Sequence, residues 1–242
     1  MATLAKKVPE TLRPGHTFCP GCGHGIFLRV LHDVFEEKGL GDNNVCHVGV
    51  GCSANYHIYA CNGGNAVTGH HGRVPVAARA MKAMLPDTFI WTYQGDGDAY
   101  AIGMGETMLA AHFDYPITVF VINNGNYGMT GGQMAPTTLI GQITTTTQKG
   151  STLRPFDVMK HIQIMDHVAY AARGTVASPA EIRKLKNYIS KAVDVQMKMK
   201  KYSIVEILSP CPTNWKKTPA ESNKRILEEV TKVFPLGEFR TY

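Results

Sequence analysis

Apolar residues along the chain occur in two spacings, which predict helices and strands in alternation. Helical spacing is typical of segments 26–37, 75–85, 102–112 and a helix from 179 onward that a capping box opens. Short apolar runs indicate strands at 45–50, 89–93, 117–122 and 202–208. The run at 117–122 is uniformly apolar, as central parallel strands tend to be. We therefore expect an α/β fold with an open, mostly parallel sheet flanked by helices.

The other segments are polar or rich in turn-forming residues. Residues 1–18 are expected to form an N-terminal arm, and residues 212–242 a C-terminal tail. Residues 123–156 are rich in Gly and Thr, and a loop of that length in a compact domain is usually functional. With 242 residues and no internal repeat, the chain fits one domain over 1–242.

Composition and charge narrow the class of protein. Hydrophobic residues make up 44% and charged residues 18%, which is ordinary for a globular protein. No apolar run reaches the roughly 18 residues that span a bilayer, and the N-terminus has no signal pattern, so we expect a cytoplasmic protein without a membrane span. The net charge of +6 is concentrated in lysines of the last quarter. They indicate a solvated surface or a docking site for an acidic partner, and no motif suggests nucleic-acid binding.

Two polar segments directly follow expected strands. They are Gly95-Asp96-Gly97-Asp98 and Asn123-Asn124-Gly125-Asn126-Tyr127, with 25 residues between Gly97 and Asn123. Glycines allow backbone N–H groups to approach a phosphate, and two phosphates need a counter-ion such as Mg²⁺. The expected Mg²⁺ ligands are the side chains of Asp96 and Asn124 and the backbone carbonyl of Asn126. Either segment alone is often only a tight turn; the pair, in this order, predicts a diphosphate site.

Six cysteines stand at positions 19, 22, 46, 52, 61 and 211. The Cys19-Pro20-Gly21-Cys22 segment fits half a zinc site, a redox dithiol or half an iron–sulfur site. The zinc interpretation requires a second close pair of ligands, whereas the other cysteines are scattered. The iron–sulfur interpretation requires two distant thiolates, and Cys52 and Cys211 each follow an expected strand.

The paired motifs resemble those of thiamine diphosphate enzymes, in which a Gly-Asp-Gly segment precedes a paired Asn. The resemblance implies a thiamine diphosphate-binding domain of the pyrophosphate type. It also implies that Gly97, Asp98, Gly128 and Met129 line the diphosphate side.

The whole chain resembles the β subunit of 2-oxoacid:ferredoxin oxidoreductases. The matching segments run in family order: Cys-Pro-Gly-Cys-Gly-His-Gly at 19–25, Gly-Cys-Ser at 51–53, His-Gly-Arg at 71–73, Gly-Asp-Gly-Asp at 95–98, Tyr-Gly-Met-Thr-Gly-Gly-Gln at 127–133, Ala-Pro-Thr-Thr at 135–138 and Ser-Pro-Cys at 209–211. The resemblance implies one [4Fe–4S] cluster held by Cys19, Cys22, Cys52 and Cys211. It further implies cofactor contacts from Val50, Gly51, Cys52, Ser53 and His71.

In such enzymes a 2-oxoacid is decarboxylated oxidatively, coenzyme A takes the acyl group, and electrons leave one at a time through the cluster to ferredoxin. The motif variants look most like the 2-oxoisovalerate type, with 2-oxoglutarate second. No convincingly placed Glu faces the cofactor in this sequence, and the resemblance implies that the α subunit supplies it. We expect an α₂β₂ or larger assembly, with a γ/δ or ferredoxin-like subunit as a further possible member.

Some positions depart from the family pattern or fit more than one role. His24 stands where many relatives carry an acidic residue, so it orients substrate, contacts the cofactor or simply packs. Met129 is expected to form an apolar wall beside the reacting carbon. Cys46 is expected to fill the core, and no spacing argument assigns Cys61.

Two other functions fit parts of the sequence. A non-oxidative thiamine diphosphate-dependent decarboxylase subunit would leave the cysteines without a role. A zinc-stabilised, non-catalytic binding module would use the cysteines and leave the diphosphate motifs without one.

Overall fold

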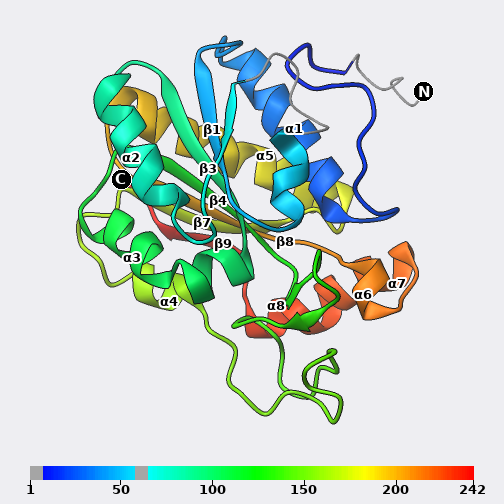
Figure 1. Cartoon of the computed structure of the whole chain (residues 1–242). Helices are drawn as coiled ribbons and strands as arrows, with labels where there is room; N and C mark the ends of the chain where they lie inside the picture. Colours follow the sequence, from blue (N-terminus) through cyan, green and yellow to red (C-terminus); the bar gives the residue numbers. More distant parts are fainter. Residues whose placement is uncertain (1–7, 58–64) are drawn as a thin grey trace.

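The computed structural model describes residues 8–57 and 65–242, so Cys61 lies outside the described residues. A seven-stranded sheet forms the centre of the molecule, in the order β2-β1-β3-β4-β8-β7-β9 (Figure 1). Its strands are β1 (Asn44–Val48), β2 (Ala66–Thr68), β3 (Phe89–Gly95), β4 (Thr118–Asn123), β7 (Tyr170–Thr175), β8 (Ser203–Leu208) and β9 (Gly237–Arg240). All neighbours pair in parallel except β7 and β9. The expected open, mostly parallel sheet is confirmed.

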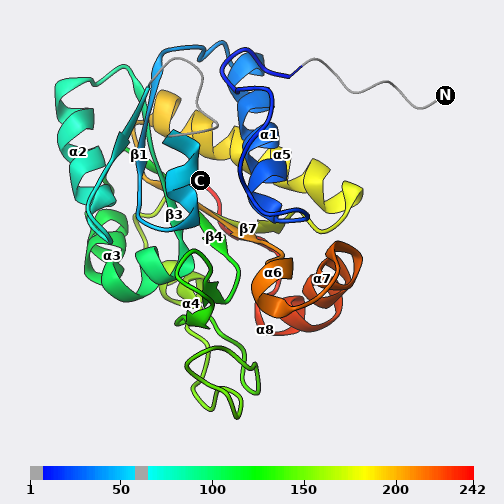
Figure 2. The same ribbon diagram turned by 45° about the vertical axis from the view of Figure 1, so that its right-hand side comes forward.

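Helices cover both faces of this sheet (Figure 2). One face carries α1 (Gly23–Glu37) and α5 (Pro179–Asp194), and the other carries α2 (Val74–Met84), α3 (Met104–His112) and α4 (Val158–Ile162). Side chains of β3 alternate between the two cores, so Trp91 and Tyr93 join the α1–α5 side while Ile90 joins the α2–α3 side. Burial on both faces explains the uniformly apolar strand sequences.

The expected elements agree with the structure to within a few residues at their ends. The first helix begins three residues earlier than expected, at Gly23, and the first strand ends at Val48 instead of residue 50. The helix expected at 102–112 is preceded by a π-helical turn, Asp98–Ile102. Residues 123–156 contain only a small hairpin, β5 (Asn126–Tyr127) with β6 (Gln133–Met134).

The sequence indicated no strand at β7, and the C-terminal segment is not a tail. Residues 212–242 form α6 (Pro212–Trp215), α7 (Pro219–Arg225), the π-helical turn Ile226–Val230, α8 (Thr231–Val233) and β9. The segment is held because Ile226, Val230 and Phe234 form a buried cluster with Leu208. Its polar residues lie on the outside of short helices, which is why its composition resembled that of a tail.

Most lysines of the last quarter face acidic groups of this same chain. Those in ion pairs are Lys184, Lys186, Lys191, Lys198, Lys200, Lys201 and Lys224. Their charge is therefore partly compensated within the chain, which favours the solvated-surface interpretation. None of the helices in the described ranges is long and apolar enough to cross a membrane.

Candidate cofactor site

The carboxyl ends of β1, β3, β4 and β8 meet at one edge of the sheet, where ligands of open α/β sheets usually bind. A small cleft opens there. Its lining comes from the segments at the ends of β1, β3 and β4 and from the start of α1: His24, Val50, Gly51, Cys52, Ser53, Gly95, Asp96, Gly97, Asp98, Asn124, Asn126, Tyr127 and Gly128. The structure thus brings together the two motifs expected to hold a diphosphate.

Asp96 lies at the floor of this cleft and is almost fully buried. Its Oδ2 accepts hydrogen bonds from the Gly125 N–H (2.9 Å) and from the Thr137 hydroxyl. Burial raises the pKa of Asp96 to about 7, and the charge of Glu206 adds to the shift. Burial makes the charged form of this carboxyl group unfavourable, while the hydrogen bonds hold the group in place. A bound cation would stabilise the charged form, so Asp96 is suited to bind one.

The turn after β4 is held by its own amides. The Asn126 N–H donates to Asn124 Oδ1 (3.2 Å), and Asn126 Nδ2 donates to the Asn124 carbonyl (2.9 Å). Trp215 Nε1 also donates to that carbonyl (3.2 Å). Gly125 adopts φ 66°, a left-handed conformation that glycine takes without strain. The oxygen donors expected to bind Mg²⁺ therefore lie in a fixed turn beside Asp96.

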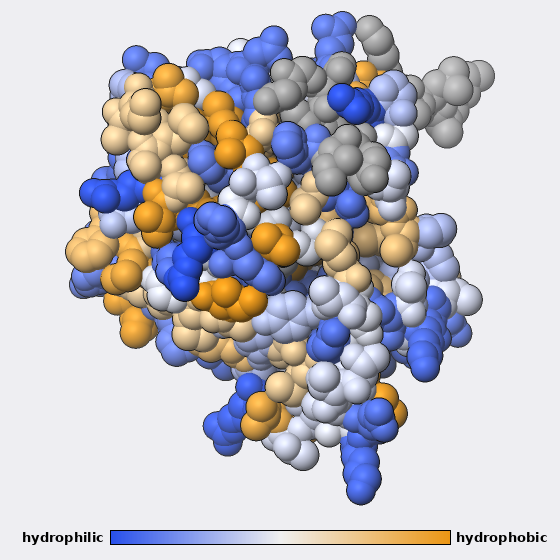
Figure 3. Space-filling view, in the orientation of Figure 1, coloured by the Kyte–Doolittle hydropathy of each residue, from blue (hydrophilic) through white to orange (hydrophobic). Residues whose placement is uncertain are grey.

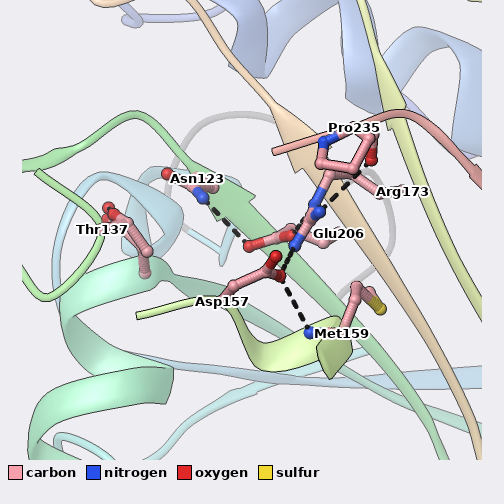
Figure 4. Close-up of polar contacts among 8 residues, drawn as sticks. Asn123, Thr137, Asp157, Met159, Arg173, Glu206 and Pro235 are labelled. Atoms are coloured by element: carbon pink, nitrogen blue, oxygen red, sulfur yellow. Dashed lines mark hydrogen bonds and ion pairs between the residues drawn. The ribbon is translucent and has the colours of Figure 1, made fainter. Parts of the chain in front are cut away.

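A buried ionic network anchors the start of this turn (Figure 4). Asn123 Nδ2 donates to Glu206 Oε1 (3.0 Å), and Arg173, fully buried on β7, pairs with both Glu206 and Asp157. Arg173 Nη1 also donates to the Pro235 carbonyl (3.2 Å). Sequence reasoning missed this network, because its members lie far apart along the chain.

Asp98 lines the cleft, as expected for the diphosphate side, and its carboxyl group is held by neighbouring segments. Its Oδ1 binds His71 Nδ1 and the Gly72 N–H (2.8 Å), while its Oδ2 accepts from Gln94 Nε2 (2.7 Å). Both carboxyl oxygens are thus engaged by the protein. Because a carboxylate accepts, His71 Nδ1 is the protonated ring nitrogen when the imidazole is neutral, and Nε2 is left as an acceptor. Asp98 lines the cleft and orients His71.

Two glycines leave room where the loops approach each other. A Cβ on Gly97 would lie 2.3 Å from the Tyr127 ring, and a Cβ on Gly128 would lie 3.2 Å from the Cys52 sulfur. The Tyr127 hydroxyl donates to the Gly97 carbonyl (3.2 Å), which joins the two motifs directly. Met129 follows Gly128 but is half exposed and does not line the cleft.

The Cys19–Cys22 turn lies against the loop that carries Cys211. The Cys22 N–H donates to the Cys19 carbonyl (3.0 Å), and the Gly23 N–H donates to the Pro210 carbonyl (3.4 Å). A Cβ on Gly21 would collide with Pro219 at 2.5 Å, so the turn packs closely on the C-terminal segment.

The four cysteines expected to bind a cluster are neighbours. Burial raises the pKa of Cys22 to about 12 and that of Cys52 to about 11, and in both cases Cys211 and Cys19 raise the pKa further. Within the described part of the chain, no three His, Cys, Asp or Glu side chains converge to hold a single metal ion. Cys₄ sets of this kind are the ligands that [4Fe–4S] clusters use in proteins, and here three segments of the chain carry the four thiols.

Comparisons with known proteins identify the family of this chain. Residues 45–207 match the family model described as thiamine pyrophosphate enzyme, C-terminal TPP binding domain. The 2-oxoglutarate synthase subunit KorB of Archaeoglobus fulgidus is 36% identical over 217 residues, which are 87% of this chain and 75% of that protein. The chain belongs to the thiamine diphosphate-binding subunits of the 2-oxoacid:ferredoxin oxidoreductases.

Other members of this family match to different extents. The ketoisovalerate oxidoreductase subunit VorA of Methanothermobacter thermautotrophicus is 37% identical over 228 residues, covering 92% of this chain but 47% of that protein. The chain thus spans about half the length of the VorA subunits that it matches. The fold is that of a 2-oxoglutarate:ferredoxin oxidoreductase from Magnetococcus marinus, with a TM-score of 0.82 at 22% identity over 100% of this chain and 87% of that one.

The sequence left the role of His24 open. This residue is buried, its Nδ1 pairs with the Tyr93 hydroxyl, and its ring stacks on Phe18 at 5.0 Å. Burial lowers the pKa of His24 to about 3, so the imidazole is neutral near pH 7. His24 is therefore packed against Phe18 and Tyr93 at the lining of the cleft. Cys46 is fully buried in β1, as a core residue should be.

Proposed function

We propose that this chain is the β subunit of a 2-oxoacid:ferredoxin oxidoreductase, which oxidatively decarboxylates a 2-oxoacid to an acyl-CoA and CO₂. Electrons pass one at a time through a [4Fe–4S] cluster to ferredoxin. One observation carries the proposal: the four-cysteine set adjoins the Asp96–Asn124 edge, and Cys52 belongs to both. A non-oxidative enzyme has no use for thiols at that place.

On the diphosphate side, the ligands of Mg²⁺ are Asp96, Asn124 and the backbone carbonyl of Asn126. Mg²⁺ accepts few protein oxygens and completes its octahedron with phosphate and water, which matches three donors at one edge. Gly97 and Gly128 lie on the diphosphate side of the cleft lining. Residues Val50 to Ser53 also line the cleft.

Bound thiamine diphosphate supplies the electron sink that decarboxylation requires. The protein's own groups bind and orient. His71, held through Nδ1 by Asp98, keeps Nε2 as a hydrogen-bond acceptor, and His24 lines the cleft. Met129, half exposed beside Gly128, forms an apolar wall on the substrate side.

On the cluster side, the ligands are Cys19, Cys22, Cys52 and Cys211. Cys22 and Cys52 are partly buried and Cys211 is buried, whereas Cys19 is exposed. The cluster edge at Cys19 is thus nearest to solvent, and an acidic ferredoxin or a ferredoxin-like γ/δ subunit would approach there. Lys216 and Lys217 lie on the adjoining C-terminal segment, where opposite charge would speed encounter.

The substrate is 2-oxoisovalerate or 2-oxoglutarate. The relatives named above are a ketoisovalerate oxidoreductase subunit and a 2-oxoglutarate synthase subunit. The Magnetococcus marinus enzyme was solved with 2-oxoglutarate, coenzyme A and succinyl-CoA bound. The slightly higher identity to VorA and the motif variants favour the branched-chain acid.

The enzyme works as a hetero-oligomer, α₂β₂ or larger, in the cytoplasm. The described lining of the cleft contains no Glu, so the glutamate that activates the cofactor comes from the α subunit. Figure 3 shows apolar side chains gathered over α2 and α3, where Val76, Met84, Leu109 and Phe113 are exposed. An exposed apolar surface of this kind marks a protein interface.

The test is anaerobic purification of the chain with its α partner, followed by an absorption spectrum and analysis of Fe, S²⁻, Zn and thiamine diphosphate. We expect a brown protein with about four Fe per chain and one thiamine diphosphate. A colourless protein that holds thiamine diphosphate would instead indicate a non-oxidative decarboxylase subunit. Zinc without thiamine diphosphate would indicate a binding module.

A further inference from the structure

The amide of Asn214 lies between the two proposed centres. Its Nδ2 is 3.0 Å from the Gly128 carbonyl, 3.2 Å from Asn126 Oδ1 and 3.5 Å from the Cys211 sulfur. Asn126 and Gly128 belong to the diphosphate side, whereas Cys211 belongs to the cluster side.

The position of this amide is fixed by close packing. A Cβ on Gly132 would lie 3.0 Å from Asn214 Oδ1, so the chain leaves space for Asn214 by placing a glycine opposite it. The backbone N–H of Asn214 also donates to the Cys211 sulfur, so this one residue gives that sulfur two hydrogen bonds. The Cys211 thiol also lies 3.8 Å from Asn126 Oδ1, so Asn214, Cys211 and Asn126 contact one another.

We propose that Asn214 is a positioning residue that couples the two centres: its amide holds the Asn126–Gly128 turn against the cluster loop and raises the reduction potential of the cluster. The inference rests on the proposed function, because it requires a cluster at Cys211. It goes further by assigning a role to a residue outside both ligand sets.

The physical reason is the charge that the cluster gains on reduction. One electron enters from substrate oxidation and later leaves to the carrier, and no proton moves at Asn214. A donor hydrogen bond to a ligand sulfur stabilises the more negative, reduced state more than the oxidised one, and such bonds are among the groups that set cluster potentials. Removing the donor therefore makes reduction less favourable.

The experiment is a redox titration of the anaerobically purified complex, followed by the electron paramagnetic resonance signal of the reduced cluster. For Asn214→Ala we expect about a tenfold smaller equilibrium constant for one-electron reduction, which is about 59 mV more negative. Asn214→Asp keeps the size but replaces the donor with an acceptor, so its shift should be larger. Thr213→Ala, a change at the exposed preceding residue, is the matched control and should leave the potential unchanged.

The outcomes separate this inference from the proposed function. An iron-replete Asn214 variant with an unchanged potential overturns the inference alone. If Asn214→Ala loses iron, the reduction potential is measured in Asn214→Asp instead, and an unshifted potential in that variant also overturns the inference. Absence of iron from the unmodified complex overturns the proposed function, and the inference with it.

Discussion

The diphosphate side and the cysteine side share one edge of the sheet but are built in different ways. On the diphosphate side, Asp96, Asn124 and Asn126 all have hydrogen-bond partners within the protein. On the cysteine side, Cys22 and Cys52 have pKa values raised by burial and by the neighbouring thiols. The first site has its geometry before any ligand arrives, whereas the second gathers groups that repel each other once ionised.

The difference follows from how each site is connected. The diphosphate motifs follow β3 and β4, which are hydrogen-bonded neighbours, so the sheet itself sets their distance. The cysteines come from the N-terminal turn, the segment after β1 and the segment after β8, which only tertiary packing brings together. Where ligands must be deprotonated to bind, the metal itself stabilises the assembled site. We therefore expect the cysteine side to depend on its metal and the diphosphate side to be largely preorganised.

The largest expected effect is that of Cys211→Ala. Loss of one thiolate ligand should reduce iron from about four per chain to background, while thiamine diphosphate stays bound within about twofold. Iron analysis and calorimetric titration of the cofactor measure the two quantities. Cys46→Ala, which removes a thiol from the core, is the control and should retain iron. Full iron content in Cys211→Ala would remove that residue from the ligand set.

The second largest expected effect is that of Asp96→Asn, which tests whether the cofactor can be lost while the iron stays bound. The amide lacks the charge that balances Mg²⁺, so thiamine diphosphate affinity should fall about a hundredfold, or about 2.7 kcal/mol. Iron content should not change, because the cluster ligands lie on other loops. Asp166→Asn, at an exposed position, should leave the affinity intact. Concerted loss of iron and cofactor would show that the two sides are not independent.

Acid should weaken the helix that carries the cysteine turn. Burial lowers the pKa of His32, on α1, to about 3, and its Nδ1 is paired with the Thr11 hydroxyl at 2.7 Å. The unfolded chain binds a proton below its ordinary pKa of about 6.5, whereas the folded chain does not until about pH 3. Stability is thus complete above about pH 6.5 and falls as the pH drops, by up to about 1.4 kcal/mol per pH unit for this residue.

His32→Gln removes that titration. Urea unfolding of the metal-free chain at about pH 5 and about pH 7.5 should show a smaller pH difference in the free energy of unfolding than the unmodified chain shows. His70→Gln, an exchange at an exposed site, serves as the control. An identical pH difference in His32→Gln would mean that His32 is not the group concerned.

The smallest expected effect is that of Thr137→Val, which removes one donor to Asp96 and keeps the side-chain shape. A hydrogen bond to a charged group contributes about 1.5 kcal/mol at the lower end of its range, so cofactor affinity should fall about tenfold, with iron unchanged. Thr152→Val, on the exposed loop, is the control. An unaltered affinity would mean that Asp96 does not need this support and that the preorganisation is weaker than the hydrogen bonds suggest.

Sequence reasoning located the strands that carry the motifs but missed residues that act through packing. β7 was not recognised because its sequence, Tyr170–Thr175, carries an arginine in place of a continuous apolar run. Arg173 is tolerated in the sheet because Glu206 and Asp157 neutralise it from other parts of the chain. Asn214 and Trp215 were missed for a related reason, since only the folded C-terminal segment places them beside the Asn124 turn.

The sequence by itself determined the alternation of helices and strands, the family and the residue types of both sites. Those features are local: apolar spacing sets each element, and the motifs stand immediately after strands, at the edge where parallel sheets bind ligands. The tertiary structure decided that Asp98 contacts His71, that His24 is buried against Tyr93 and that Asn214 contacts both sides. These depend on burial and on contacts between segments distant in the chain, which no local pattern records.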